Sequence, residues 1–412
     1  MRLLTVFLFT LFACGHVGRA AGTPWQPLIL VGLDGFGSNY TEKFAAESPT
    51  LRLLKRDGAS VRGLIPSFPS NTFPNLYTLV TGLYPARHGI VNNDFLDPES
   101  GQIFRYNQPA SALHPRWWGG EPIWVTAIKQ GRKSATSFWV GSEVPVGGVR
   151  PTFWQRFDYS IPFERRLDDL LGWLTLPESE RPAMVTFYLE ETNSAGHRFG
   201  PDSAELAAAV KLLDSRIATL LARLRAANLE PNLVITSDHG MTATSVDRVV
   251  LLDDQLDLKS VQIDSEGSAL ALRPLQGDAV TLVKKLANVP HARAYLADDL
   301  PARFRLRDNA RIAPVWVLPD EGWHISTRAN FERLKTRYPE RGYLAGDHGY
   351  DPALPSMQGI LIAHGPAFRR GVEAPATENI HVYPLLCAVL GLQPAPVDGD
   401  DRLARALLRV RP

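Results

Sequence analysis

Short segments of the chain are almost entirely apolar and then change abruptly to polar residues. They include PLILVGLDG at 27–35, AMVTFYLEE at 183–191 and NLVITSDHG at 232–240. Short runs without polar alternation are typical of strands buried on both faces of a parallel sheet. The segment MQGILIAHG at 357–365 has the same pattern, and we expect it to form a strand of the same kind.

Between positions 202 and 228, apolar residues recur at alternating four- and three-residue steps, which is the period of an amphipathic helix. The residues are Leu206, Val210, Leu213, Ile217, Leu220 and Leu224. Asp202, followed three residues later by Glu205, is expected to cap this helix. Because strands alternate with helical segments, the pattern predicts an α/β fold with a mostly parallel central sheet flanked by helices.

Residues of about 250–345 have a different character. Short segments such as ALALRPL, ARAYLADDL and RIAPVWVLPD surround one helical stretch, DAVTLVKKLAN. This pattern predicts a small α+β lobe inserted between two core strands. Because no repeat or low-complexity linker divides the chain, we expect a single domain over residues 22–412 that carries this lobe.

The first 21 residues predict a secretory signal peptide. One basic residue precedes an apolar run from Leu3 to Ala13, and small residues end at Ala21. The run is too short to span a bilayer, and no later segment is long and apolar enough to do so. An alternative is a lipoprotein cleavage box at 11–14, which would make Cys14 a lipid anchor, although Phe12 fits that box poorly.

The composition changes this interpretation only slightly. Apolar residues make up 45% of the chain and charged residues 21%, which is typical of a folded globular protein. The net charge of +1 gives no electrostatic reason to expect a nucleic-acid polymer or a membrane surface as partner. Because Cys14 and Cys387 are the only cysteines, no intrachain disulfide can form after either cleavage. We expect an exported protein of the bacterial periplasm, and the sequence does not indicate its oligomeric state.

Residues of the types that bind metals lie where the predicted strands end or in a glycine-flanked loop. They are Asp34, Asn193, His197, Asp238, His239 and His348. Ligands bind at the carboxyl ends of strands in open α/β sheets. Any one of these residues alone would suit an ordinary surface turn, but together they predict a site of the zinc type, with enough carboxylate and imidazole groups for two ions.

Thr72 lies at the expected start of a helix, in SFPSNTFPNLYTLVTGLYPARHG at 67–89. A threonine hydroxyl is a weak nucleophile unless a base or a metal activates it, and a helix N-terminus attracts phosphate. Beside a two-metal site, Thr72 would have both advantages. Asn75, one turn later, is expected to donate to a non-bridging phosphate oxygen. The simpler alternative is that Asn71 or Thr72 only caps the helix.

The segment TFPNLYTLVTGLYPARHGIVNN resembles the nucleophile segment of the nucleotide pyrophosphatase/phosphodiesterase family, within the alkaline phosphatase superfamily. Further similar segments follow in order: VGLDGF at 31–36, WWGGEPIWVTA at 117–127, YLEETNSAGHRFGP at 188–201, TSDHGM at 236–241, GDHGYD at 346–351 and NIHVYPLLCAVLGLQPAP at 379–396. The resemblance implies an alkaline phosphatase-like fold and two zinc ions. It also implies hydrolysis of nucleotide phosphodiester or pyrophosphate bonds, with a nucleoside 5′-monophosphate as product.

Carried over by position, the resemblance makes Thr72 the nucleophile, which would form a phosphothreonine intermediate. It implies a first zinc held by Asp34, Asp238 and His239 that also contacts Thr72, and a second zinc held by His197 and His348. In the family, the remaining ligand of the second zinc is an aspartate four residues before the position of His197. This chain has Asn193 there.

Three consequences of Asn193 are open. Its amide oxygen binds the second zinc more weakly, or Glu190 or Glu191 takes its place, or turnover is impaired and the protein only binds its substrate. We favour the first, because every other position of the site matches the family. A phosphomonoesterase or a lipid-headgroup phosphodiesterase of the same fold also stays open, since the motifs say less about the substrate.

Several conspicuous side chains are expected to be structural. His88, His324 and His364 are interpreted as satisfied histidines, and the tryptophans of WWGGEPIW as packing residues. Phe73 is expected either to stack on a substrate base or to pack in the core.

Overall fold

The structure, a computed structural model, describes residues 26–409, in which eight strands form the central sheet. Their order across the sheet is β19-β2-β18-β9-β1-β8-β6-β7. The strands are β1 (Leu28–Leu33), β2 (Ala59–Val61), β6 (Ser134–Ser137), β7 (Phe153–Gln155), β8 (Met184–Leu189), β9 (Asn232–Thr236), β18 (Leu361–His364) and β19 (Val372–Ala374). The expected signal peptide and Cys14 lie outside the described residues.

Strand directions confirm the predicted α/β class and correct one strand. β1 lies between β8 and β9 and is parallel to both, and β6 and β7 continue the parallel part. β18, however, is antiparallel to both β9 and β2, so the prediction of a fourth strand of the same kind was wrong in direction. An apolar run reports burial and not direction. Because of the reversal, His364 lies at the opposite edge of the sheet from Asp34.

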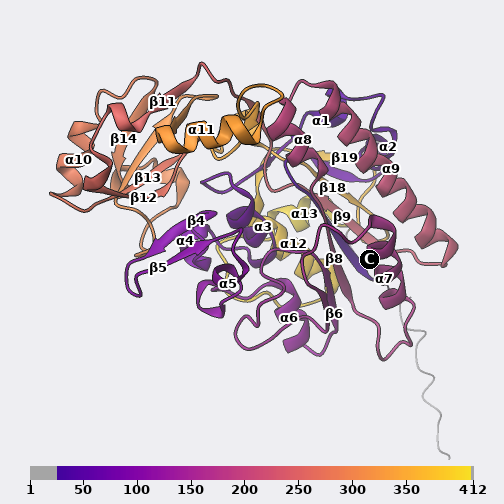
Figure 1. The fold of residues 1–412 in the computed structure, drawn as a ribbon. Coiled ribbons are helices and arrows are strands. Elements are labelled where there is room, and N and C mark those ends of the chain that lie inside the picture. Colours follow the sequence, from indigo (N-terminus) through magenta and orange to yellow (C-terminus); the bar gives the residue numbers. More distant parts are fainter. Residues whose placement is uncertain (1–25, 410–412) are drawn as a thin grey trace, which may run out of the picture.

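Helices cover both faces of the sheet (Figure 1), because alternate residues of each strand point to opposite sides. Leu28 and Leu30 belong to one apolar core, and Ile29, Val31 and Leu33 belong to the other. The first core is shared with α3 (Thr72–Thr81), α6 (Ile123–Lys129), α12 (Val382–Leu390) and α13 (Arg402–Leu407). The second is shared with α2 (Pro49–Asp57), α7 (Phe163–Leu174) and α9 (Ala204–Ala226).

Helix α9 confirms the predicted apolar stripe, since all six of its predicted residues are buried. The capping prediction was wrong. Ser203 caps the helix, accepting from the Leu206 amide at 3.1 Å, while Asp202 forms an ion pair with Lys43. The buried Asp214 accepts from two amides in the first turn of α2, which fixes α2 against α9 and places a carboxylate at a helix N-terminus.

A separate lobe with its own apolar core occupies the segment where an insertion was expected. Its antiparallel sheet has the order β12-β13-β15-β14. The strands are β12 (Val261–Ser265), β13 (Leu270–Pro274), β14 (Ala292–Leu296) and β15 (Val315–Pro319), and the helices are α10 (Ala279–Lys285) and α11 (Arg328–Arg337). β11 (Val249–Leu251) and β16 (His324–Ser326) pair at its base.

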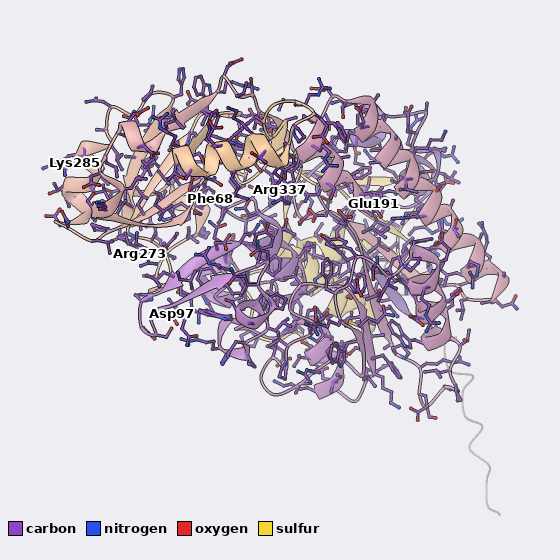
Figure 2. The ribbon with its side chains drawn as sticks, in the orientation of Figure 1. Phe68, Asp97, Glu191, Arg273, Lys285 and Arg337 are labelled. Carbon is purple, nitrogen blue, oxygen red and sulfur yellow. The ribbon has the colours of Figure 1, made fainter. Side chains whose placement is uncertain are left out.

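Arg273 connects this lobe to the rest of the fold. Its Nε donates to Asp264 at 2.8 Å, and its Nη2 donates to the Leu96 carbonyl at 3.2 Å. Leu96 belongs to the hairpin of β4 (Asp94–Asp97) and β5 (Gln102–Arg105). Figure 2 shows Arg273 above this hairpin, near Asp97. The lobe is therefore held beside the residues that follow α3 in the chain.

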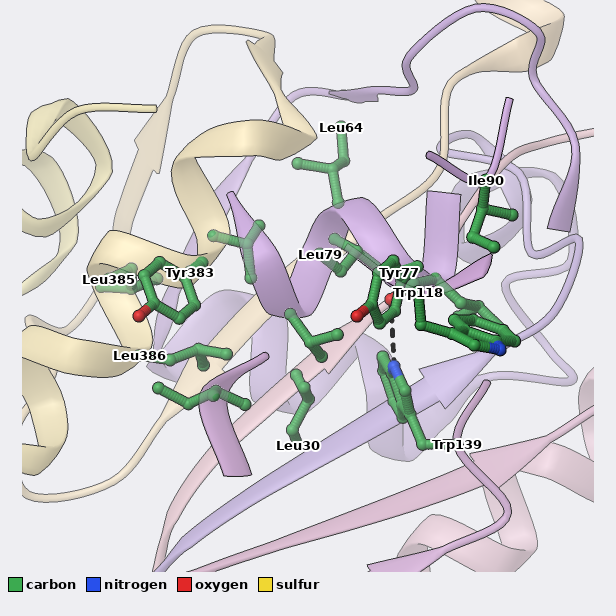
Figure 3. Close-up of a cluster of buried hydrophobic side chains, with 14 of the residues drawn as sticks. Leu30, Leu64, Tyr77, Leu79, Ile90, Trp118, Trp139, Tyr383, Leu385 and Leu386 are labelled. Atoms are coloured by element: carbon green, nitrogen blue, oxygen red, sulfur yellow. Dashed lines mark hydrogen bonds between the residues drawn. The ribbon is translucent and has the colours of Figure 1, made fainter. Parts of the chain in front are cut away.

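Helix α3, which carries Thr72 at its start, is packed firmly into the first core (Figure 3). Tyr77 and Leu79 of α3 are fully buried. The Trp139 indole donates to the Leu76 carbonyl at 3.0 Å, and the Tyr77 hydroxyl donates to the Gly119 carbonyl at 2.9 Å. This packing fixes the position of the helix N-terminus.

Shorter elements complete the described part of the chain. They are α1 (Tyr40–Lys43), α4 (Pro85–His88), α5 (Pro109–Ala112), α8 (Glu191–Phe199), β3 (Leu64–Ile65), β10 (Thr242–Ala243), β17 (Gly346–Asp347) and β20 (Thr377–Glu378). Among the residues described, no helix has the length and apolar character needed to cross a membrane.

Candidate active site

Thr72 is the first residue of α3, and its hydroxyl is partly accessible. Its Oγ1 lies 3.2 Å from Nε2 of His239. Asn71 precedes the helix but makes no side-chain cap; its amide donates instead to Asn92 Oδ1 at 2.7 Å. Neither residue therefore acts as an ordinary side-chain cap, and the Thr72 hydroxyl faces the residues predicted to bind metal.

Asp34, Asp238 and His239 form a buried group at the carboxyl ends of β1 and β9. One side-chain atom from each lies within 4.8 Å of the others, close enough for the three to hold a metal ion. His239 Nε2 is 3.4 Å from Asp34 Oδ1 and 3.3 Å from Asp238 Oδ2. These two carboxylate oxygens are buried and have no hydrogen-bond partner among the described residues. Buried polar atoms are rarely left unpaired, so the arrangement suits a bound cation.

The other oxygen of each carboxylate is held by neighbouring residues. The Tyr188 hydroxyl donates to Asp34 Oδ2, and the amides of Gly35 and His239 donate to Asp238 Oδ1 at 3.2 and 3.1 Å. These contacts orient the two unpartnered oxygens toward His239 Nε2. Such hydrogen bonds from surrounding groups are what fix the orientation of ligands in metal sites.

Burial dominates the electrostatics of this group. Loss of solvent raises the pKa of Asp34 well above its usual range and raises the pKa of Asp238 to about 7. Burial also lowers the pKa of His239 to about 3, which keeps its imidazole neutral. A dication between the carboxylates would reverse the first two shifts, because it stabilises the ionised forms.

His197, Asp347 and His348 form a second group in which ligand atoms again lie within 4.8 Å of one another. The imidazole rings of His239 and His348 are stacked with centroids 3.5 Å apart, so the two groups adjoin. Ions of two-metal hydrolytic sites lie roughly 3.5–4 Å apart. The two groups together therefore suit a pair of neighbouring ions beside Thr72.

The three site histidines have the same hydrogen-bond arrangement. Nδ1 of His197, His239 and His348 lies 2.8, 2.8 and 3.0 Å from the carbonyls of Gly346, Gly240 and Ser70, respectively. A carbonyl can only accept, so Nδ1 carries the proton in each ring. Nε2 of each ring then has a free lone pair, which is the form in which histidine binds metals.

Asn193 lies directly against the Asp34 loop, at the start of α8 and one turn before His197. Its Oδ1 is buried and has no hydrogen-bond partner among the described residues. A Cβ atom at Gly35 would lie 3.0 Å from Asn193 Cα, and Gly35 has a φ of +64°, so only glycine lets the two segments approach this closely. The amide oxygen is thus buried where α8 meets the Asp34 loop, without a hydrogen-bond partner among the described residues.

The two glutamates considered as substitutes for Asn193 are engaged elsewhere. Glu191 forms an ion pair with Arg216 of α9, and Figure 2 shows it beside that helix. Glu190 accepts a hydrogen bond from Ser194 Oγ. Neither contact favours a turn toward the metal groups.

The structure does not support the phosphate-binding role predicted for Asn75. Its side chain is completely buried, and its amide nitrogen donates to carbonyls of Ser67, Pro69 and Asn71. Its Oδ1 accepts from Asn379 at 2.8 Å and from the Ser67 amide. The helical period places Asn75 one turn after Thr72. Its side chain, however, forms hydrogen bonds with the loop that precedes α3 and not with the site.

Asn93 is better placed for that role. Its Oδ1 accepts from the Phe73 amide at 3.0 Å, which holds the side chain beside Thr72. Among the described residues, its amide nitrogen makes no carbonyl contacts like those that occupy the Asn75 amide, and the residue is partly accessible. Asn93 closes the motif segment that carries Thr72, but its spacing from Thr72 gives no sign of the contact.

Aromatic side chains adjoin both ends of the site. Phe73 packs on Phe104 and Trp118 and extends to the exposed Tyr106, with ring centroids 5.6 Å apart in the last pair. Phe157, which is 39% exposed, lies 6.4 Å from the ring of Tyr188, whose hydroxyl holds Asp34. Phe73 therefore packs against two buried rings, which was one of its two expected roles. Its contact with the exposed Tyr106 forms an aromatic surface near Thr72.

The remaining conspicuous residues are structural, as expected. His88 is fully buried between Thr78 and the Ile90 amide, and the tryptophans of WWGGEPIW are buried. His324 is buried too, with Nε2 at 2.9 Å from Asp347. Sequence reasoning did not identify Tyr188 and Asp347 as site residues. Both lie in motifs at 188–201 and 346–351, but their spacing does not indicate which residues they contact.

Comparisons with known proteins agree with this geometry. Residues 28–351 match the profile of the family described as type I phosphodiesterase / nucleotide pyrophosphatase. Over 94% of the chain, it is 38% identical to venom phosphodiesterase CdcPDE of Crotalus durissus collilineatus and 37% identical to the human ectonucleotide pyrophosphatase/phosphodiesterase family member 1. These matches cover 47% and 42% of the two relatives, so the chain spans about half their length.

A solved structure is also similar. It is murine ectonucleotide pyrophosphatase/phosphodiesterase 5, in an inactive threonine-to-alanine variant in complex with AMP. The TM-score is 0.86 at 31% identity, and the match covers 93% of this chain and 100% of the other. Sequence profile, relatives and fold lead to one conclusion: the chain belongs to the type I phosphodiesterase/nucleotide pyrophosphatase family.

Proposed function

We propose that the protein is an exported two-zinc phosphodiesterase or pyrophosphatase. It hydrolyses nucleotide phosphodiester or pyrophosphate bonds through a phosphothreonine at Thr72 and releases a nucleoside 5′-monophosphate. The observation that carries the proposal is the Thr72 hydroxyl, which lies at a helix N-terminus 3.2 Å from His239 and beside two adjoining groups of metal-binding side chains. The solved relative bound to AMP supports a nucleotide product.

Zinc is proposed from the chemistry of the donors. Neutral imidazoles and carboxylates suit zinc, whereas magnesium prefers oxygen ligands and bound water. Asp34, Asp238 and His239 would hold one ion beside Thr72. Asn193, His197 and His348 would hold the other. When bound, the ions supply activation of the attacking hydroxyl and neutralisation of the phosphate charge.

The residues of the chain account for the rest of the reaction. Thr72 Oγ1 attacks phosphorus in line with the leaving group, and the bond from phosphorus to the leaving oxygen breaks as the bond to Oγ1 forms. The positive end of the α3 dipole and the Asn93 amide nitrogen stabilise charge on the phosphoryl oxygens. Water then attacks the same phosphorus, which frees Thr72 and releases the nucleoside 5′-monophosphate.

The products of a natural substrate test this proposal. The zinc-loaded protein should convert a nucleoside triphosphate to nucleoside monophosphate and pyrophosphate, and a dinucleoside polyphosphate to products that include the monophosphate. Chromatography against standards identifies them. Release of inorganic phosphate and a nucleoside diphosphate as first products would contradict the proposed cleavage position.

Phe157 is expected to contribute to base binding, because its exposed ring lies near the Asp34 end of the site. Stacking of one base on an aromatic ring is worth about 1–3 kcal/mol, so Phe157→Ala should raise KM for nucleotide diesters about 5- to 150-fold with a smaller change in kcat. The change should vanish for nitrophenyl methyl phosphate, which has no base. Trp154→Ala is a matched control, since Trp154 is also 39% exposed but contacts Arg150. Equal effects of Phe157→Ala on both substrates would rule out stacking.

Export is proposed from the signal peptide pattern and from the venom enzyme and ectoenzyme names of the relatives. The N-terminus of the mature protein tests it. Mass spectrometry should find a chain that begins near residue 22, or at an acylated Cys14 if the lipoprotein alternative holds. An unprocessed Met1 on protein recovered from the cytoplasm would overturn the proposal.

A further inference from the structure

The two proposed metal groups differ in charge. The first contains the carboxylates of Asp34 and Asp238 together with the neutral His239. The second zinc, as proposed, would be held by neutral ligands only, namely His197, His348 and the amide of Asn193. A dication bound by neutral ligands alone in a largely buried pocket lacks compensation for its charge, and buried charges are normally paired. His348 itself is 95% buried, which makes the imbalance costly.

Asp347 is the carboxylate that lies together with His197 and His348. It is the last residue of β17 and directly precedes His348. One oxygen of Asp347 fits with His197 and His348 in a group whose ligand atoms lie within 4.8 Å of one another. Ligands about 2.1 Å from a zinc ion lie at most about 4.2 Å apart, so this group is near the size of a metal site.

Close contacts with two histidines hold Asp347 in place. Its Oδ2 lies 2.9 Å from His324 Nε2, and His324 Nδ1 lies 3.0 Å from the Tyr343 hydroxyl. Its Oδ1 lies 3.7 Å from His197 Nδ1, the ring nitrogen that is not expected to bind the ion. His324 is buried, and its contact with Oδ2 keeps the carboxylate beside His197.

We propose that Asp347 supplies the negative charge that Asn193 does not bring to the second metal site. The inference rests on the proposed function. In it, His197 and His348 bind the ion, Asn193 contributes its amide oxygen, and Asp347 stabilises the ion from beside His197. Asp347 is thus a positioning and charge-compensating residue, anchored by His324. Glu190 and Glu191 do not compete for this role, because their carboxylates are engaged by Ser194 and Arg216.

Zinc binding to the metal-free protein tests the proposal without reference to turnover. Wild type should bind two zinc ions, the second more weakly. Asp347→Asn should weaken the second site at least tenfold, the lower end of the range for groups that surround metal ligands, and leave the first unchanged. Competition with a chromophoric chelator gives both affinities. Asp351→Asn is the matched control, since it removes a carboxylate of the same loop that is paired with Arg303 instead.

A second variant separates charge from a structural effect. Asn193→Asp places a carboxylate on the other side of the same ion, so in combination with Asp347→Asn it should restore the second-site affinity to near the wild-type value. A double variant as weak as Asp347→Asn would show a structural effect and overturn the proposal. Unchanged second-site affinity in Asp347→Asn would also overturn it, while two bound ions in wild type would leave the proposed function standing. No zinc bound to wild type would overturn both.

Discussion

Replacing Thr72 with alanine should reduce phosphodiester turnover by about 1000-fold or more, because no other hydroxyl of α3 lies at the site to take its place. Loss of the attacking group in other covalent hydrolases costs this much or more. The fold should persist, since α3 is held by buried contacts of Leu76 and Tyr77 and Thr72 itself makes no cap. Initial rates with a nitrophenyl diester give the result.

Two controls make the Thr72 result interpretable. Metal content of the alanine variant should equal that of wild type, because the six other proposed metal-binding side chains do not depend on Thr72. Thr72→Ser keeps a hydroxyl and should retain measurable turnover. If the alanine variant kept more than a few per cent of wild-type activity, attack by water without a covalent intermediate would replace the proposed mechanism.

Removal of metal is expected to have an effect of similar size. Dialysis against a chelator should abolish turnover, and zinc should restore it better than magnesium, because imidazole ligands favour zinc. The metal-free protein should also be less stable, since Asp34 and Asp238 bring two carboxylates into a buried pocket. Binding of an ion at about 1000 times its Kd stabilises a folded protein by about 4 kcal/mol, which raises Tm measurably.

A pair of histidine variants localises this effect. His348→Ala should lower both zinc content and activity, because its Nε2 faces the site. His364→Ala should change neither, because β18 is antiparallel and carries His364 to the other edge of the sheet. Full activity of chelated wild-type protein, with no zinc detected by elemental analysis, would refute the two-metal mechanism.

Much of the fold was predictable because buried segments are recognisable in the sequence by the pattern of their apolar residues. The apolar runs of β1, β8 and β9 identified strands, and the stripe of α9 identified its buried face. The direction of a strand has no such pattern in the sequence, so β18 was wrongly expected to be parallel. The cap of α9 was assigned to Asp202 because acidic residues suit that position, but Lys43 attracts Asp202 and the shorter Ser203 side chain reaches the amide instead.

Site residues that directly follow a strand could be predicted from the sequence. Residues whose contacts come from distant parts of the chain could not. Asp34, Asp238 and His239 lie together because adjacent parallel strands end at one edge. Asn75 shows the limit of the helical period, which placed its side chain correctly along α3 but could not show that the loop at 67–71 surrounds it. Tyr188 and Asp347 act through partners distant in sequence, and such contacts require the coordinates.

Turnover of a panel of nitrophenyl phosphate esters decides whether the protein is a zinc-dependent nucleotide phosphodiesterase. Mono- and diesters, including a nucleoside 5′-phosphate nitrophenyl ester and a choline phosphate nitrophenyl ester, are offered to the protein in metal-free and zinc-loaded form. We expect rapid release of nitrophenol from the nucleotide diester, slower release from simple diesters, little from the monoester, and none without metal. A preference for the monoester would indicate a phosphomonoesterase, and a preference for choline esters a lipid-headgroup phosphodiesterase. Absence of turnover on every ester by fully zinc-loaded protein would contradict the enzymatic function itself.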